Sequence, residues 1–146
     1  MTYVKIFSKS GEIPKYETEN SAGLDLRALL DEPIIIKPME RVLIPTGIFL
    51  EIPNGFEGQV RARSGLSIKY GLTMVNGVGT VDADYRGELK VPMINLGGED
   101  FKVESGDRIA QIIFARYESV TFEPVDSVES LEETKRGSGG FGHTGR

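Results

Sequence analysis

Apolar residues in this chain recur at every second position or in short solid runs, and almost nowhere at the spacing near 3.6 residues that marks an amphipathic helix. About ten such segments follow one another; they cover residues 4–7, 24–30, 33–38, 41–53, 56–64, 72–77, 88–96, 101–107, 108–118 and 121–125. Turn-forming residues separate them, as in Pro53-Asn54-Gly55. Many short strands joined by turns predict an all-β fold, namely a sandwich, a jelly roll or a barrel.

The composition narrows the chemistry that such a fold can carry. At 146 residues the chain fits one domain, large enough to bury a core without disulfides. It has no cysteine and a single histidine, His143, so a thiolate nucleophile is excluded, and a histidine-rich zinc site or a Ser-His-Asp triad is not expected. The formal net charge of −5 argues against non-specific nucleic-acid binding, and no apolar run approaches the length of a membrane span. We expect a soluble, cytoplasmic protein with neither a nucleic-acid nor a membrane partner.

The C-terminal part differs in composition from the rest of the chain. We divide the sequence into an all-β body, residues 1–126, and a short polar segment with a glycine-rich end, residues 127–146. The polar segment could make a helical turn or two. The chain ends in KRGSGGFGHTGR, which contains five glycines and three basic residues but no acid. Such an end is usually an inert flexible terminus, but Phe141 and the Arg136-Gly137 pair favour a binding role.

Two stretches are more specific than plain strand connectors, and the second combines residues that suit an anion site. SAGLDLRA places Asp25 where a strand begins, and RARSGLSIKYG presents Arg63, Ser64 and Gly65 where a strand breaks. An arginine, a hydroxyl and exposed backbone N–H groups together make a good anion nest. An ordinary turn is the more common meaning of each stretch taken alone.

The segment 76–89, NGVGTVDADYRGEL, predicts a β-hairpin with an unusual tip. Asp82 lies between Val81 and Ala83, a setting in which a carboxylate could be held in place to accept a proton from water. Tyr85 offers a flat aromatic face close by. Aspartate and glycine also suit a purely structural hairpin, so both readings stay open at this point.

Gln111 is the polar exception inside the apolar stretch GDRIAQIIF. A buried amide needs a hydrogen-bond partner. A nearby backbone group is the commoner partner, and a ligand is the alternative.

Five of these stretches occur in a fixed order: SAGLDLRA, RSGLSIKYG, GTVDADYRGEL, GDRIAQIIF and RGSGGFGHTG. Together they resemble the five motifs of the homotrimeric dUTPase (dUTP pyrophosphatase) family, over nearly the whole chain from Ser21 to Gly145. The resemblance implies a distorted jelly roll that assembles as a homotrimer with three active sites at subunit interfaces. It also implies hydrolysis of dUTP to dUMP and pyrophosphate with Mg²⁺ as cofactor, which would limit the dUTP pool and supply dUMP for thymidylate synthesis.

The third motif carries the implied catalytic and nucleoside contacts. By resemblance, Asp82 is the general base that orients and deprotonates the water attacking the α-phosphorus. Tyr85 would pack against the deoxyribose and leave no space for a 2′-hydroxyl, which an apolar surface alone rejects only by roughly a hundredfold. The uracil would lie along this segment, in contact with Asn76, Thr80, Val81 and Lys90.

The remaining body motifs would hold the phosphates. By resemblance, Ser64 and Gly65 donate to the oxygens around the α–β bridge, where negative charge accumulates as the bond breaks. Gln111 donates to the α-phosphate, and Arg63 lies in the same site. Mg²⁺ is held by the phosphates and water without direct protein ligands, as suits an ion that loses water reluctantly. Asp25 would lie near its water shell.

The glycine-rich end matches the fifth motif and would act as a lid. Left alone it should stay mobile, because glycine loses much entropy on ordering and the segment has little apolar surface to bury. With a triphosphate bound, Arg136 would pair with the γ-phosphate, N–H groups at Gly137 and beyond would approach its oxygens, and Phe141 would stack over the uracil. His143 departs from the motif, which commonly has a small hydroxyl residue there.

Two other functions compete with this one. A dCTP deaminase has a related fold, but it would need a glutamate-centred acid–base arrangement where this chain has Asp82 and Tyr85. A non-catalytic β-sandwich module that binds a nucleotide or a protein would show binding without turnover.

Overall fold

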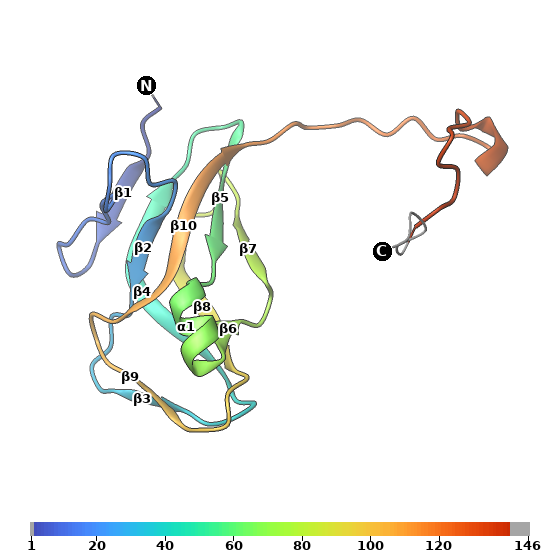
Figure 1. Cartoon of the computed structure of the whole chain (residues 1–146). Coiled ribbons are helices and arrows are strands. Elements are labelled where there is room, and N and C mark those ends of the chain that lie inside the picture. The colour runs from blue at the N-terminus through green and yellow to red at the C-terminus, as the bar shows by residue number, and fades with distance from the viewer. Residues whose placement is uncertain (1, 141–146) are drawn as a thin grey trace.

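The computed structural model describes residues 2–140, and its body consists of antiparallel strands (Figure 1). The first sheet has the order β1-β4-β8-β6, with bounds Lys5–Ser8, Arg41–Glu51, Glu88–Asn95 and Leu72–Met74. The second has the order β2-β10-β5-β7, with bounds Leu24–Arg27, Arg108–Arg116, Phe56–Arg61 and Val78–Val81. A small third sheet pairs β3 (Ile34–Ile36) with β9 (Phe101–Val103). The all-β prediction is confirmed.

Apolar side chains of both large sheets form one core. In β8 the residues Leu89, Val91 and Met93 are buried and alternate with more exposed neighbours. In β10 of the other sheet, Ala110 and Ile112 are buried on either side of the partly exposed Gln111. The period-two pattern of the sequence therefore marks the inward faces of the strands, as expected for strands covered on one side.

A bulge in β4 fixes the start of β8. The register between the two strands shifts between Pro45 and Phe49, and Gly47 inside the bulge is buried with a φ of +68°. The Gly47 N–H donates to Glu88 Oε1 at 2.8 Å, and the Thr46 hydroxyl donates to the Leu89 carbonyl at 2.7 Å. At the bulge the Gly47 N–H has no backbone partner in the strand ladder, and the Glu88 carboxylate accepts its hydrogen bond instead.

The charge of Glu88 stabilises this arrangement at neutral pH. Burial raises the pKa of the Glu88 carboxyl, but hydrogen bonds from Lys9 Nζ at 3.0 Å and the Gly47 N–H lower it by more, so the pKa lies below its ordinary value. A carboxyl with a lowered folded-state pKa contributes stability above its unfolded pKa, about 4.3, and loses it as the pH falls through the folded value.

We therefore expect Glu88→Gln to lower the free energy of unfolding at pH 7 by about 1.5 kcal/mol, the lower end of the range for a hydrogen bond to a charged group. Urea unfolding at pH 7 and again at a pH below the folded-state pKa of Glu88 measures this. The wild type and the variant should converge at the lower pH, because the carboxyl is then protonated in both states of the wild type. A difference of equal size at both pH values would show that shape, and not charge, is responsible.

Two expectations for the middle of the chain are wrong. Residues 64–70, expected as a loop after a broken strand, form helix α1 (Ser64–Tyr70), which ends at Gly71 with a left-handed φ of +71°. The segment 76–89 is not a paired hairpin: β7 pairs with β5, and β8 pairs with β4 and β6. Each strand has only two edges, so β8 has none left for β7, and the chain crosses from one sheet to the other.

The C-terminal part leaves the body after β10 and runs away from it (Figure 1). The strand expected at 121–125 is absent from the described part of the chain, whereas the short helix η1 (Val128–Ser130) confirms the helical turn expected in the polar segment. All residues from 117 to 138 are exposed, and Phe122 is 86% exposed. Within residues 2–140, no helix is long and apolar enough to cross a membrane.

Candidate active site

A cleft of about 350 Å³ lies beside β7 and the beginning of β8. It is lined by six of the residues predicted to bind or act on the nucleotide, Asn76, Thr80, Val81, Asp82, Tyr85 and Lys90. Apolar side chains that the motif analysis missed complete its walls, among them Leu43, Met74 and Pro92. They come from β4, β6 and β8, so no local pattern in the sequence could have joined them to the motif.

Asp82 owes its position to its two neighbours. Val81 is 8% exposed and Ala83 is 9% exposed, while Asp82 between them is exposed and lines the cleft. The two buried side chains anchor the backbone on either side of the carboxylate. The structure therefore presents Asp82 to the cleft from a fixed crossing between the two sheets.

Tyr85 stands over the next turn. Its N–H donates to the Asp82 carbonyl at 3.2 Å, and its hydroxyl donates to the Glu88 carbonyl at 3.1 Å. The ring covers Gly87 so closely that a Cβ there would collide with the Tyr85 hydroxyl. Glycine at 87 is therefore required for the ring to lie in this position, with 46% of the residue exposed.

A second group of site residues gathers on the other sheet. Asp25 in β2 pairs in register with Gln111 in β10, and its carboxylate accepts from Arg63 Nε at 3.0 Å and from Arg108 Nη1 at 3.3 Å. The Gln111 amide donates to the Ala62 carbonyl at 3.1 Å, so a backbone group satisfies it in this structure. Arg108 is a member of this group that the motif analysis missed.

Ser64 and Gly65 continue from Arg63 as the first residues of α1, and both are exposed. The N–H groups of a first helical turn lack partners inside the helix. A Cβ added at Gly65 would meet open space among the described residues, so the backbone is accessible there. These two residues thus extend the Asp25–Arg63 group with free donors.

The residues near Asp25 suit a hydrated cation better than a directly bound one. Each Asp25 oxygen faces an arginine, and only 16% of the side chain is exposed. Across residues 2–140 there is no cluster of three or more acidic, histidine or cysteine residues that could enclose a metal ion. A carboxylate held in this way can still accept hydrogen bonds from the water shell of Mg²⁺.

The predicted site residues form three separate sets in the chain. Among the described residues that line the Asp82 cleft, none belongs to the Asp25–Arg63 group. Arg136 and Gly137 lie on the C-terminal segment, away from the body, where Arg136 Nε donates to the Gly139 carbonyl at 2.8 Å (Figure 1). Phe141 and His143 lie outside the described residues.

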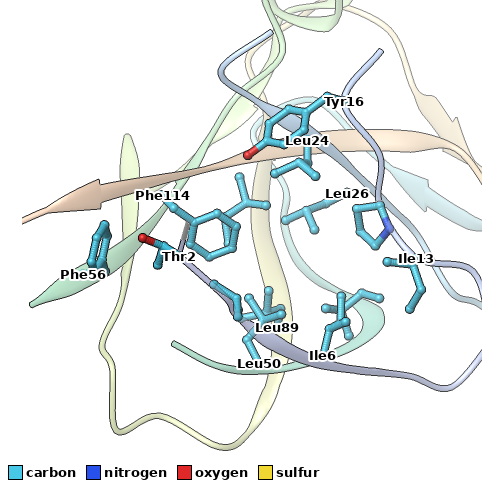
Figure 2. Close-up of a pocket in the computed structure, with 14 residues that line it drawn as sticks. Thr2, Ile6, Ile13, Tyr16, Leu24, Leu26, Leu50, Phe56, Leu89 and Phe114 are labelled. Carbon is cyan, nitrogen blue, oxygen red and sulfur yellow. The ribbon is translucent and has the colours of Figure 1, made fainter. Parts of the chain in front are cut away.

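A larger apolar pocket, of about 410 Å³, lies between β1, β2 and β10 (Figure 2). Its walls carry side chains such as Ile6, Leu24 and Phe114, and none of the described site residues. Tyr16 is its single ionisable side chain among the described lining residues. The described lining thus holds a phenol but no carboxylate that could act as a base at neutral pH, and the Asp82 cleft is the stronger candidate for the active site.

Comparison with known proteins identifies the family of this chain. The dUTPase family model matches residues 9–145. The deoxyuridine 5'-triphosphate nucleotidohydrolase of Finegoldia magna is 54% identical over 143 residues, covering 97% of this chain and 98% of that protein.

Solved structures of dUTPases have the same fold. The Staphylococcus bacteriophage 80alpha dUTPase with dUpNHpp superposes with a TM-score of 0.85 at 26% identity, covering 100% of this chain and 99% of that chain. A mutant dUTPase from phage phi11 of S. aureus, with a structural Mg(II) ion, has a TM-score of 0.77 at 21% identity, covering 87% and 99%. The body is thus a jelly roll of the dUTPase type, and with its family match over residues 9–145 this chain belongs to the dUTPase family.

Proposed function

We propose that this protein hydrolyses dUTP to dUMP and pyrophosphate in the cytoplasm. The observation that carries the proposal is the single cleft in which Asp82 and Tyr85 meet the predicted base contacts, among them Asn76 and Lys90. The nucleotidohydrolase name of the 54% identical relative supports the same reaction.

Asp82 acts as the general base. Its carboxylate is exposed at the cleft, where it orients a water molecule toward the α-phosphorus and accepts the water's proton as the new P–O bond forms. The bond from the α-phosphorus to the bridging oxygen breaks, and the electron pair leaves with pyrophosphate. Tyr85 closes the 2′ side of the sugar, and Thr80 and Val81 of β7 lie along the base.

The Asp25–Arg63 group binds the phosphates. Arg63, Ser64, Gly65 and Gln111 supply donors to their oxygens, and the exposed first turn of α1 lets the backbone approach them. Bound Mg²⁺ would neutralise part of the phosphate charge. Asp25 would accept hydrogen bonds from the water molecules around Mg²⁺.

We propose a homotrimer in which subunits share each active site. The separation of the Asp82 cleft from the Asp25–Arg63 group within one chain supports this, because the reaction needs both beside the same nucleotide. The exposed segment 117–138 supports it too: Val120, Phe122 and Val128 are apolar and largely exposed on the single chain. Burying them against another copy is favourable by about 25 cal/mol per Å².

A substrate panel tests the proposed reaction. dUTP, UTP, dTTP and dCTP are each incubated with the protein and Mg²⁺, and pyrophosphate and ammonia are measured. We expect pyrophosphate from dUTP at a rate far above the other three. Ammonia from dCTP would instead identify a deaminase, and tight dUTP binding without any product would identify a binding module.

Tyr85 should carry the discrimination between dUTP and UTP. Tyr85→Ala opens the space beside the 2′ position, so the ratio of the two kcat/KM values should fall by about tenfold or more. Tyr85→Phe is the matched control: it removes only the hydroxyl bonded to the Glu88 carbonyl and keeps the ring over Gly87. An unchanged ratio in Tyr85→Ala would mean that another group excludes the ribonucleotide.

A further inference from the structure

Arg86 is an exposed, charged residue whose side chain nevertheless folds back onto its own loop. Its Nη1 atom donates to the Ala83 carbonyl at 2.7 Å and to the Tyr85 carbonyl at 3.0 Å. Holding a long side chain in one conformation costs rotamer entropy, which an arginine free in water would keep. Charge-assisted hydrogen bonds to two carbonyls offset this cost.

These two bonds close the turn that carries the site. The Tyr85 N–H donates to the Asp82 carbonyl, so three hydrogen bonds tie together residues 82–86, and Arg86 provides two of them. Ala83 is buried. The guanidinium therefore links Tyr85, which is half exposed, to a buried residue of the same loop.

Arg86 itself lies outside the set of described residues that line the cleft. The contacts that Arg86 makes are with its neighbours in the loop, so the effect argued here passes through them. Tyr85 has two further restraints, the hydroxyl bond to Glu88 and the packing of the ring on Gly87. Both act on the side chain, whereas Arg86 acts on the backbone.

We propose that Arg86 is a positioning residue that holds the backbone of Tyr85, and with it the wall that excludes a 2′-hydroxyl. The assignment rests on the proposed function for its effect on selectivity. The Tyr85 ring excludes a 2′-hydroxyl only if it stays in place, because a mobile ring could move aside and admit the ribose. By bonding the Ala83 and Tyr85 carbonyls, Arg86 restricts the backbone motion that would let the ring move aside.

The test compares Arg86→Ala and Arg86→Lys with Arg41→Ala, the matched control at an exposed arginine in β4 outside the cleft. Amide hydrogen exchange at Tyr85 is measured without nucleotide, and kcat and KM are measured for dUTP and UTP. For Arg86→Ala we expect exchange at Tyr85 to accelerate about tenfold and the dUTP/UTP ratio of kcat/KM to fall by about tenfold. Lysine keeps the charge but is shorter, so Arg86→Lys should be intermediate, and Arg41→Ala should match the wild type.

Two results would overturn the proposal. Unchanged exchange at Tyr85 in a folded Arg86→Ala variant would show that the arginine does not hold the turn. Equal increases in KM for dUTP and UTP, with the ratio preserved, would show that Arg86 contacts the phosphates directly. If the wild type fails to hydrolyse dUTP, the proposed function is wrong, but the exchange measurement still decides whether Arg86 holds Tyr85.

Discussion

Replacing Asp82 by asparagine should leave a folded protein that binds dUTP but turns it over about 10²- to 10⁴-fold more slowly, the usual contribution of a general base. The amide keeps the size of the side chain between the buried Val81 and Ala83, so the crossing between the sheets should persist. It cannot accept the proton of the attacking water. Single-turnover hydrolysis of dUTP, with the dissociation constant measured separately, separates the chemical step from binding.

Asp84→Asn is the matched control for this change. It removes the same charge two residues away, in the same loop, from an exposed side chain outside the described lining of the cleft. Its turnover should stay close to that of the wild type. A near-normal kcat in Asp82→Asn, or an equal loss in both variants, would remove Asp82 from the role of base.

Truncation after Glu133 should also abolish most turnover while leaving the body folded. The removed residues contribute no buried side chain to the described core, so the melting temperature should change little. dUMP should still bind, because its base and α-phosphate contacts lie in the body. Turnover of dUTP should fall by about 100-fold, since loss of the groups that position the γ-phosphate misplaces the reacting atoms. Phe141→Ala should give a milder loss, because stacking on one base is worth about 1–3 kcal/mol.

Mixing two inactive variants tests whether the tail serves another subunit. Asp82→Asn supplies an intact tail, the truncated chain supplies an intact Asp82, and the subunits are allowed to exchange. If one subunit's tail closes a neighbour's site, the mixture regains a fraction of the wild-type activity. Arg136→Ala with an intact Asp82 should be rescued in the same way. No recovery after confirmed subunit exchange would restrict the tail to its own subunit.

The period-two pattern of apolar residues predicted most of the body, because successive side chains along a strand alternate between core and surface. Leu89, Val91 and Met93 are buried as the period-two pattern of β8 requires. The proximity of Asp82 and Tyr85 was predictable for a similar reason: both belong to one short motif, and a short loop keeps them close wherever its strands run. These inferences needed no knowledge of which strands pair.

The features that sequence reasoning missed depend on contacts between distant segments. Helix α1 is too short to show a helical period. It packs on distant segments, with Tyr70 against Phe101 at 5.0 Å between ring centroids and Leu66 against the core. The hairpin at 76–89 was wrongly expected because strands adjacent in the sequence were treated as partners. In the structure β7 pairs with β5, and β8 pairs with β4. The ion pair of Arg108 with Asp25 joins residues 83 positions apart.

The ion pair between Asp25 and Arg63 means that an arriving phosphate does not meet a bare cation. If Arg63 binds a phosphate as proposed, its guanidinium exchanges one anionic partner for another. The free energy of capture is then the difference between two ion pairs and not the whole of one. Under the same proposal, the carboxylate would recover the arginine when pyrophosphate departs. Competition from Asp25 for the guanidinium would then favour release of the product.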